Sequence, residues 1–138
     1  MTKIEQIMTR DPIYLTQHAN INKARMMMAD KRIRHIPVKD PESGKLIGMV
    51  SQKAVLANAI KIINLRGLDQ LEYTEKSADI GSIMEQSPAV FDINSELVDI
   101  ANSLIEQRTG CVAIERDNEL VGVVTSNDFV KFAVRELS

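Results

Sequence analysis

The sequence predicts a mixed α/β (α+β) fold in which two pseudo-symmetric βαββα repeats pack face to face through their sheets. Three observations lead to this prediction. The motif IMTRDP at 7–12 returns as IMEQSP at 83–88, with the methionines and the prolines each 76 residues apart. The motif GMVSQKA at 48–54 returns as GVVTSND at 122–128. Between these motifs, both copies contain short apolar runs of strand length and longer stretches with helical apolar spacing.

The composition is that of an ordinary globular protein. Of the 138 residues, 44% are hydrophobic and 26% are charged, and the net charge is −2. Binding to nucleic acid or to an anionic membrane therefore has no electrostatic support. No run approaches the roughly 18 apolar residues of a membrane span, and the N-terminus lacks the apolar core of a signal peptide. We expect a cytoplasmic protein in which Cys111, the single cysteine, is a buried structural thiol.

In the first copy, a brief strand is expected at 13–15, and a helix follows with Asn20 as its N-cap. The apolar residues of this helix fall on one face: Ile21, Ala24, Met27 and Met28. Strands at 36–38 and 46–50 are joined by the turn formers DPESG. A closing helix ends near Gly67. Its apolar positions are Val55, Leu56, Ala59, Ile60 and Ile63.

The second copy repeats this order of elements. Strands are expected at 89–91, 111–114 and 120–124, and the first helix begins near Ser95. That helix carries the apolar residues Leu97, Ile100, Ala101, Leu104 and Ile105. The closing helix carries Phe129, Val130, Ala133, Val134 and Leu137. The last two strands are joined by the turn RDN.

These elements divide the chain into a first repeat at 1–65, a connecting segment at 66–77 and a second repeat at 78–138. The connecting segment is polar, and a short helical lead at 80–84 opens the second repeat. One small sheet with two helices leaves an apolar face uncovered and is hard to stabilise alone. We therefore expect the repeats to pack as one pair, with two equivalent clefts between them.

The motif GVVTSND marks a point where a strand ends and a helix begins. Free backbone N–H groups and the positive end of the helix dipole make such a junction a ready site for phosphate. A carboxylate one turn into the helix, Asp128, can accept hydrogen bonds from a ribose diol. The same residues also fit a capping box, in which Thr125 is the N-cap and Asp128 reaches back to it. The sequence leaves both interpretations open.

Two βαββα copies, each with an IM..xP entrance, a PV-like central strand and a G-h-h-[ST]-x-x-[D] exit, resemble the CBS domain pair, also called the Bateman module. The resemblance covers about residues 1–65 and 78–138 and suggests a stand-alone pair. It implies a regulatory module that binds adenosine-containing ligands, such as AMP, ADP, ATP or S-adenosylmethionine, in the clefts between repeats. It also implies a homodimer of two pairs and an effector protein, still unknown, that senses the ligand.

Carried onto this sequence, the resemblance implies one competent site. Thr125, Ser126 and Asp128 match the positions around the phosphate and the ribose, and Arg34 and His35 match basic residues that meet phosphates from the partner repeat. Ala89 and Val90 match positions that line the adenine pocket. In the first copy, Ala54 replaces the carboxylate, so Ser51, Ile13 and Tyr14 form a weaker cleft. Gly110 and Cys111, the counterparts of the basic pair, carry no charge.

Alternatives remain for several of these residues. Arg34 and His35 also fit a solvated helix end, where cations complement the dipole, and Ala89 and Val90 suit a core equally well. The two histidines, His18 and His35, have no cysteines or paired carboxylates at metal-ligand spacing, and no catalytic motif occurs. We therefore expect no enzyme, no catalytic residue, no metal site and no required cofactor.

Two questions about ligands and function stay open at this point. The first is whether magnesium accompanies ATP, because the sequence shows no dedicated set of ligands for this ion. The other is an alternative function from a different class, in which the protein is a dimeric interaction scaffold with vestigial ligand clefts.

Overall fold

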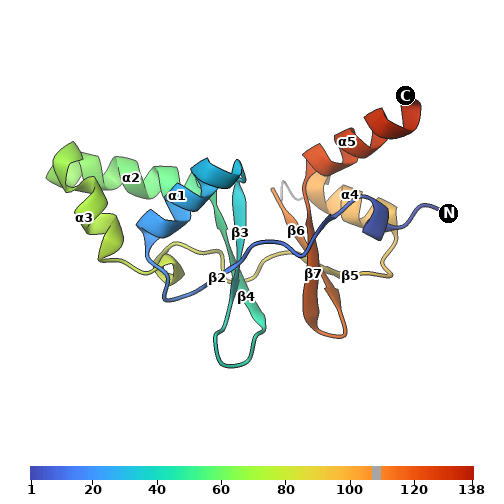
Figure 1. The fold of residues 1–138 in the computed structure, drawn as a ribbon, viewed down its shortest axis with the longest axis horizontal. Helices are drawn as coiled ribbons and strands as arrows, with labels where there is room; N and C mark the ends of the chain where they lie inside the picture. Colours follow the sequence, from blue (N-terminus) through green and yellow to red (C-terminus); the bar gives the residue numbers. More distant parts are fainter. Residues whose placement is uncertain (107–109) are drawn as a thin grey trace. The chain divides into compact units, whose positions relative to one another are not determined.

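The computed structural model describes residues 1–106 and 110–138, and these form two compact units (Figure 1). We call Ile13–Ser87 the first-repeat unit, because it contains the helices and strands of the first repeat. Met1–Pro12 joins Pro88–Ser138 in the second-repeat unit. The mixed α/β architecture predicted from the sequence is confirmed within each unit, whereas the face-to-face packing of the two repeats stays a prediction.

The first-repeat unit contains a three-stranded sheet with the order β2-β3-β4. Its strands are β2 (Leu15–Thr16), β3 (His35–Lys39) and β4 (Leu46–Ser51). Strand β2 is parallel to β3, and β3 is antiparallel to β4. The helices of this unit are α1 (Ile21–Lys31), α2 (Gln52–Arg66), α3 (Leu71–Lys76) and the 3-10 turns η2 (Leu68–Gln70) and η3 (Ile80–Ser82). Its core is an aliphatic cluster that includes Ile21, Ile36, Val38, Val50 and Ile80.

Predicted capping residues define the ends of these helices. The side chain of Asn20 accepts a hydrogen bond of 2.8 Å from the backbone N–H of Lys23 and so caps α1. Helix α2 ends at Gly67, whose φ of 93° lies in the region that favours glycine. Its N–H donates to the carbonyl oxygen of Ile63 at 2.9 Å. Both predictions of helix ends are confirmed.

The second-repeat unit contains a four-stranded sheet with the order β1-β7-β6-β5. Its strands are β1 (Thr9–Arg10), β5 (Val90–Asp92), β6 (Val112–Arg116) and β7 (Glu119–Val124), and its helices are η1 (Ile4–Gln6), α4 (Leu97–Glu106) and α5 (Ser126–Leu137). Asp117 and Asn118 both have positive φ in the turn between β6 and β7, as a two-residue hairpin turn matched to strand twist requires. The core cluster of this unit includes Ile4, Ile100, Val112, Ile114 and Val124.

The entrance segment of each sequence repeat packs on the sheet of the other repeat. Strand β1 pairs with β7, so that Thr9 lies opposite Val123 and Arg10 lies opposite Gly122. In the first-repeat unit, Glu85 and Met49 exchange two backbone hydrogen bonds of 2.8 and 3.0 Å. The compact units therefore differ from the sequence repeats, because the two IM motifs are exchanged between them.

The two motif glycines make this exchange sterically feasible. A Cβ atom at Gly122 would collide with the Sδ atom of Met8, and one at Gly48 would lie 2.6 Å from the Sδ atom of Met84. Each methionine belongs to the IM motif of the opposite repeat. The glycine of each G-h-h-[ST] exit therefore provides the space in which the other repeat's entrance lies.

Two expectations about the helices need correction. The apolar positions predicted for the closing helices do not form a buried face: Leu56, Ile60 and Ile63 are exposed on α2, and none of the residues of α5, all of them described, is buried. Of the positions predicted for α2, Val55 and Ala59 are buried, and the third buried residue is Ile62, which was not predicted. In addition, the connecting segment is itself helical, since it contains η2 and α3. None of the helices in the described part of the chain is both long and apolar enough to cross a bilayer.

Candidate functional site

The junction between β7 and α5 has the geometry of a helix cap built around a carboxylate. Thr125 is the N-cap of α5, with extended backbone, and Asp128 lies in the first turn. The Oδ2 atom of Asp128 accepts hydrogen bonds from the backbone N–H of Thr125 at 2.9 Å and from its hydroxyl at 3.2 Å. Ser126 follows Thr125 as the exposed first residue of the helix. The capping alternative is thus confirmed for Asp128.

Thr9 holds the other oxygen of the carboxylate. Its hydroxyl donates to the Oδ1 atom of Asp128 at 3.3 Å, although 119 residues separate the two in sequence. Thr9 reaches this position because β1 is paired with β7. The sequence analysis missed Thr9. The available signal was its place inside the repeated motif IMTRDP, where the second copy has Glu85 instead.

This arrangement suits a ligand that carries hydroxyl groups. Both carboxylate oxygens are oriented by donors, and the side chain of Asp128 is only half-buried. An ionised carboxylate has about four acceptor sites, so the Oδ1 atom of Asp128, which accepts one hydrogen bond from Thr9, can accept another from a ligand hydroxyl. The helix opens with the N–H groups of Ser126 and Asn127, and such groups have no acceptor within a helix and can bind an anion. The junction therefore combines a carboxylate that can accept hydrogen bonds from a diol with backbone N–H groups that can donate hydrogen bonds to an anion.

The positions predicted to line an adenine pocket lie on the same sheet as this junction. Val90 is the register partner of Ala113, which is in turn the partner of Val123 on β7. Two strand spacings, about 10 Å, therefore separate β5 from β7. Val90 is 40% exposed, as an apolar contact surface requires, whereas Ala89 is partly buried against the core cluster. The core alternative thus describes Ala89 better than Val90.

Cys111 lies next to this junction as a buried, neutral thiol. Burial first, and the negative charge of Asp128 second, raise the pKa of Cys111 to about 12. The prediction of a buried structural thiol is confirmed. The Cys111 thiol is therefore uncharged at neutral pH and adds no charge beside Asp128.

The first-repeat unit contains a second strand-to-helix junction with different chemistry. The hydroxyl of Ser51 caps α2 by accepting a bond of 3.1 Å from the N–H of Ala54. His35 is the register partner of Ser51, and the carbonyl oxygen of Arg34 accepts from the N–H of Gln52 at 2.8 Å. The basic pair therefore lies beside the N-terminus of α2, on β3 and its approach, and not at the end of α1. The solvated-helix-end alternative for the basic run 31–35 is confirmed for Lys31 and Arg32, which are exposed at the end of α1, and is wrong for Arg34 and His35.

His35 is partly withdrawn from solvent in this position. Burial, and to a smaller extent the positive charge of Arg34, lower the pKa of His35 below its ordinary value of 6.5. Arg34 itself is exposed. The imidazole is therefore neutral at pH 7 and can donate or accept one hydrogen bond from each ring nitrogen, according to its tautomer.

The two remaining residues of the weaker site precede β2. Ile13 and Tyr14 are exposed, and the Nζ atom of Lys39 lies 4.1 Å from the centroid of the Tyr14 ring. One face of this ring is thus occupied by a cation.

The structure assigns the predicted site residues to two groups. The second-repeat unit contains Thr125, Ser126, Asp128, Ala89 and Val90, and the first-repeat unit contains Arg34, His35, Ser51, Ile13 and Tyr14. That one ligand contacts both groups stays a prediction. Within the described residues, no three histidine, cysteine or carboxylate side chains gather as metal ligands would.

Comparison with known proteins places these features in a family context. The protein MJ1404 of Methanocaldococcus jannaschii is 29% identical over 135 residues, which are 95% of this chain and 32% of that protein. The chain thus spans about a third of this relative's length. The crystal structure of AcuB from Vibrio cholerae covers 99% of this chain and 93% of its own, with a TM-score of 0.80 and 30% identity.

Two further structures show the same fold at lower identity. CBSX2 in complex with AMP covers 100% of both chains, with a TM-score of 0.79 and 22% identity. The CBS domain pair of MJ0100, in complex with 5′-methylthioadenosine and S-adenosyl-L-methionine, covers 99% of this chain and 98% of its own, with a TM-score of 0.77 and 20% identity. The family model described as CBS domain matches residues 4–61 and 80–135. Because these two matches span most of the chain, and both repeats fold as described above, the protein belongs to the CBS domain family.

Proposed function

We propose that this protein is a regulatory module that binds an adenosine-containing ligand, such as AMP, ADP, ATP or S-adenosylmethionine, and signals its presence to a partner protein. The observation that carries the proposal is the Asp128 carboxylate, which is oriented by Thr9 and Thr125 and lies at the N-terminus of α5. The complexes of CBSX2 with AMP and of MJ0100 with S-adenosyl-L-methionine support the choice of ligand class. A nucleotide needs no metal or further cofactor in this proposal.

The ligand's parts match the groups around α5. The ribose hydroxyls donate to the carboxylate of Asp128, which Thr9 and Thr125 hold in place. The phosphates accept from the backbone N–H groups of Ser126 and Asn127 at the start of the helix. The base packs on Val90, with Ala89 contributing from the edge of the core. Arg34 and His35 add charge and hydrogen bonds to the phosphates, a role that rests on the repeat pattern alone.

Regulation follows if the ligand prefers one arrangement of the repeats over another. A ligand shifts such an equilibrium only by its difference in affinity for the two arrangements, typically about 1 to 3 kcal/mol in coupled sites. An effector protein then responds to the arrangement and not to the ligand itself.

We also propose that the protein acts as a homodimer. The closing helices expose apolar stripes at equivalent positions of the two repeats, Leu56, Ile60 and Ile63 on α2 and Val130, Val134 and Leu137 on α5. A surface that occurs twice in each chain is suited to a symmetric, self-complementary interface. Sedimentation velocity tests this with Val134→Glu, which should yield monomers. Val98→Glu, at an exposed position of α4, is the matched control and should remain dimeric.

The deciding experiment is isothermal titration with AMP, ADP, ATP and S-adenosylmethionine, and with GTP as the control nucleotide. We expect saturable binding of an adenosine ligand at one site per chain. Asp128→Ala should weaken it at least about tenfold, since hydrogen bonds to a charged group contribute about 1.5 to 3 kcal/mol each. The unfolding free energy should fall by only about 0.5 to 2 kcal/mol through loss of the cap. Asn127→Ala, an exposed change in the same turn, should retain affinity.

Other outcomes decide between this proposal and its alternatives. Equal affinity in Asp128→Ala would show that the ribose lies elsewhere, and two sites per chain would show that Ala54 does not disable the first junction. Arg34→Ala and His35→Ala test the phosphate assignment, because they should weaken ATP more than adenosine.

The second candidate function is a dimeric interaction scaffold with vestigial clefts. Two observations favour it: Asp128 already has a structural role as a capping residue, and the apolar stripes on α2 and α5 are exposed. Absence of binding by every adenosine ligand at millimolar concentration, together with stable dimers, would favour the scaffold over the sensor.

A further inference from the structure

Helix α3, in the segment that connects the two repeats, is anchored by a carboxylate. Glu75 is fully buried, and it is the one buried residue among the six of this helix, all of which the structure describes. Its neighbours Glu72, Tyr73 and Lys76 are exposed. The helix therefore lacks the buried apolar stripe by which a short surface helix ordinarily docks.

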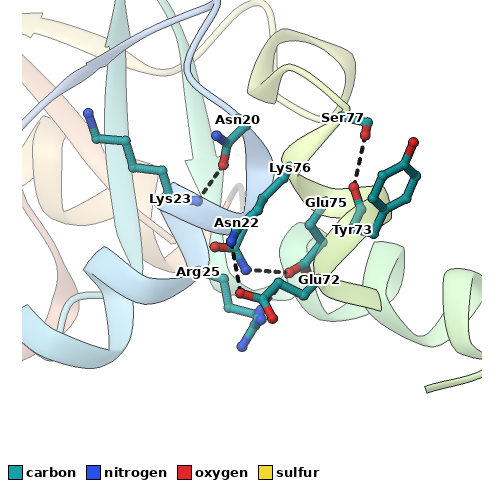
Figure 2. Close-up of polar contacts among 9 residues, drawn as sticks. All are labelled: Asn20, Asn22, Lys23, Arg25, Glu72, Tyr73, Glu75, Lys76 and Ser77. Atoms are coloured by element: carbon teal, nitrogen blue, oxygen red, sulfur yellow. Dashed lines mark hydrogen bonds and ion pairs between the residues drawn. The ribbon is translucent and has the colours of Figure 1, made fainter. Parts of the chain in front are cut away.

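Glu75 is held by two residues of α1 (Figure 2). Its Oε1 atom accepts a hydrogen bond of 2.8 Å from the Nε atom of Arg25 and one of 3.2 Å from the Nδ2 atom of Asn22. Asn22 is itself buried, and Arg25 is partly exposed. Both of these side-chain hydrogen bonds from α1 to α3 thus end on the same oxygen of Glu75.

The rest of this interface is incompletely satisfied. The Oε2 atom of Glu75 and the Oγ1 atom of Thr74, both on α3, are buried and have no hydrogen-bond partner among the described residues. Each of these groups would bond to water if α3 left its place. Docking of α3 therefore carries a desolvation cost that an apolar interface would not have.

We propose that α3 is a releasable latch, which the contact of Glu75 with Arg25 and Asn22 fixes in one position on α1. A buried ion pair selects a single docked geometry but adds little net stability, because desolvation offsets its attraction. A helix of six residues is unstable on its own, so release of Glu75 also unravels α3. The free-energy difference between docked and released α3 is therefore smaller than the difference between the folded and the unfolded first-repeat unit.

The latch lies at the end of the segment that connects the two repeats, directly before the second repeat. Two residues beyond α3, the carbonyl oxygen of Ala78 accepts a bond of 3.0 Å from the N–H of Ile21. The N–H of Ile80 then donates to the carbonyl oxygen of Ala19 at 2.8 Å. Because Ile80 is fully buried in the core cluster, release stops there. The latch therefore controls residues 67–79 and leaves the sheet of the first-repeat unit in place.

Hydrogen exchange measured by mass spectrometry tests the latch. In the wild type, amides of α3 should exchange at least about tenfold faster than those of α1, because local opening needs less free energy than unfolding of the unit. Glu75→Gln should accelerate exchange in 71–76 by a further factor of about ten, with α4 and β6 unchanged. Glu72→Gln is the matched control: it removes the same charge from an exposed position of the same helix and should change exchange less than about twofold.

Two further variants keep the test decisive if Glu75→Gln fails to fold. Asn22→Ala removes one of the two donors to Glu75 and should accelerate exchange of α3 by a few-fold. The double variant Arg25→Met with Glu75→Leu replaces the pair by apolar side chains and should slow exchange of α3 below the wild-type rate. Exchange of α3 at the rate of α1 in the wild type, or uniform acceleration of the whole unit in Asn22→Ala, would overturn the proposal.

Discussion

Substitution of Gly122 by alanine tests how the entrance segment is accommodated at the candidate site. Gly122 lies on β7 opposite Arg10, three residues before Thr125. A Cβ atom there would collide with the Sδ atom of Met8 and would lie 3.0 Å from its Cγ atom and 3.1 Å from the carbonyl oxygen of Thr9. The alanine methyl group therefore pushes on the residues that bring the Thr9 hydroxyl to Asp128.

The expected magnitude follows from two opposing effects. Overpacking of this kind costs about 1 to 3 kcal/mol, while alanine gains about 0.5 to 1 kcal/mol over glycine from backbone entropy. Since the flexible end of Met8 can move aside, we expect Gly122→Ala to lower the unfolding free energy by about 0.5 to 2 kcal/mol. Urea titration followed by circular dichroism measures this, with an unchanged m-value as the sign that the folded state is intact.

A double-variant cycle identifies the cause. Met8→Ala removes the colliding side chain, so its combination with Gly122→Ala should be more stable than the sum of the single effects predicts, by about 1 kcal/mol or more. Met8→Ala combined with Gly48→Ala is the matched control, because Gly48 faces Met84 and not Met8. Additivity of Met8→Ala and Gly122→Ala would refute the assignment of β1 to the edge of this sheet.

Three other results are expected. Thr9→Val should weaken adenosine-ligand binding several-fold in calorimetry, whereas Thr9→Ser should retain it, because serine keeps the hydroxyl that donates to Asp128. Equal affinity of the two variants would show that Thr9 does not belong to the site. For His35, the lowered folded-state pKa means that the unfolded chain takes up a proton first, so stability is lost as pH falls below about 6.5. Urea titrations between pH 5 and 8 should show this loss in the wild type and a flatter dependence in His35→Gln. The pKa of Cys111, raised to about 12, predicts that iodoacetamide at pH 8 modifies the native protein at least about a hundredfold more slowly than the urea-unfolded chain; similar rates would show that the thiol is accessible.

Local sequence patterns predicted most of the fold. The two repeats, the strands around the central turns and the cap at Asn20 depend on neighbours within a few residues, and all are present. Strand β1 was missed because two residues show no periodicity and their partners on β7 lie more than a hundred positions away. Helix α3 was missed because its one buried residue is Glu75, which an apolar pattern does not detect.

The candidate site was predictable to the extent that it is local. Thr125 and Asp128 lie within one helical turn, and the motif predicted both the junction and its capping contact. Thr9 was missed because its contact with Asp128 depends on the pairing of β1 with β7, of which the repeated motif IMTRDP gave only an indirect signal. For the basic pair, a local interpretation was misleading. Lys31 ends α1, but the chain turns at Arg32, so that His35 lies in β3 next to Ser51 and not at the end of a helix.

The two junctions share a backbone but differ in the chemistry that they present. Each is a strand end followed by a capped helix, with the other repeat's entrance segment paired to the strand. Where the second-repeat unit has Asp128 and Thr9, the first has Ala54 and Glu85. At the first junction, Ala54 and Glu85 thus provide neither the carboxylate of Asp128 nor the hydroxyl of Thr9. Because the two positions contact each other only through the exchanged entrance, a working site needs a matched pair of residues from both repeats. We therefore expect the number of ligand sites per chain to depend on these few side chains and not on the fold.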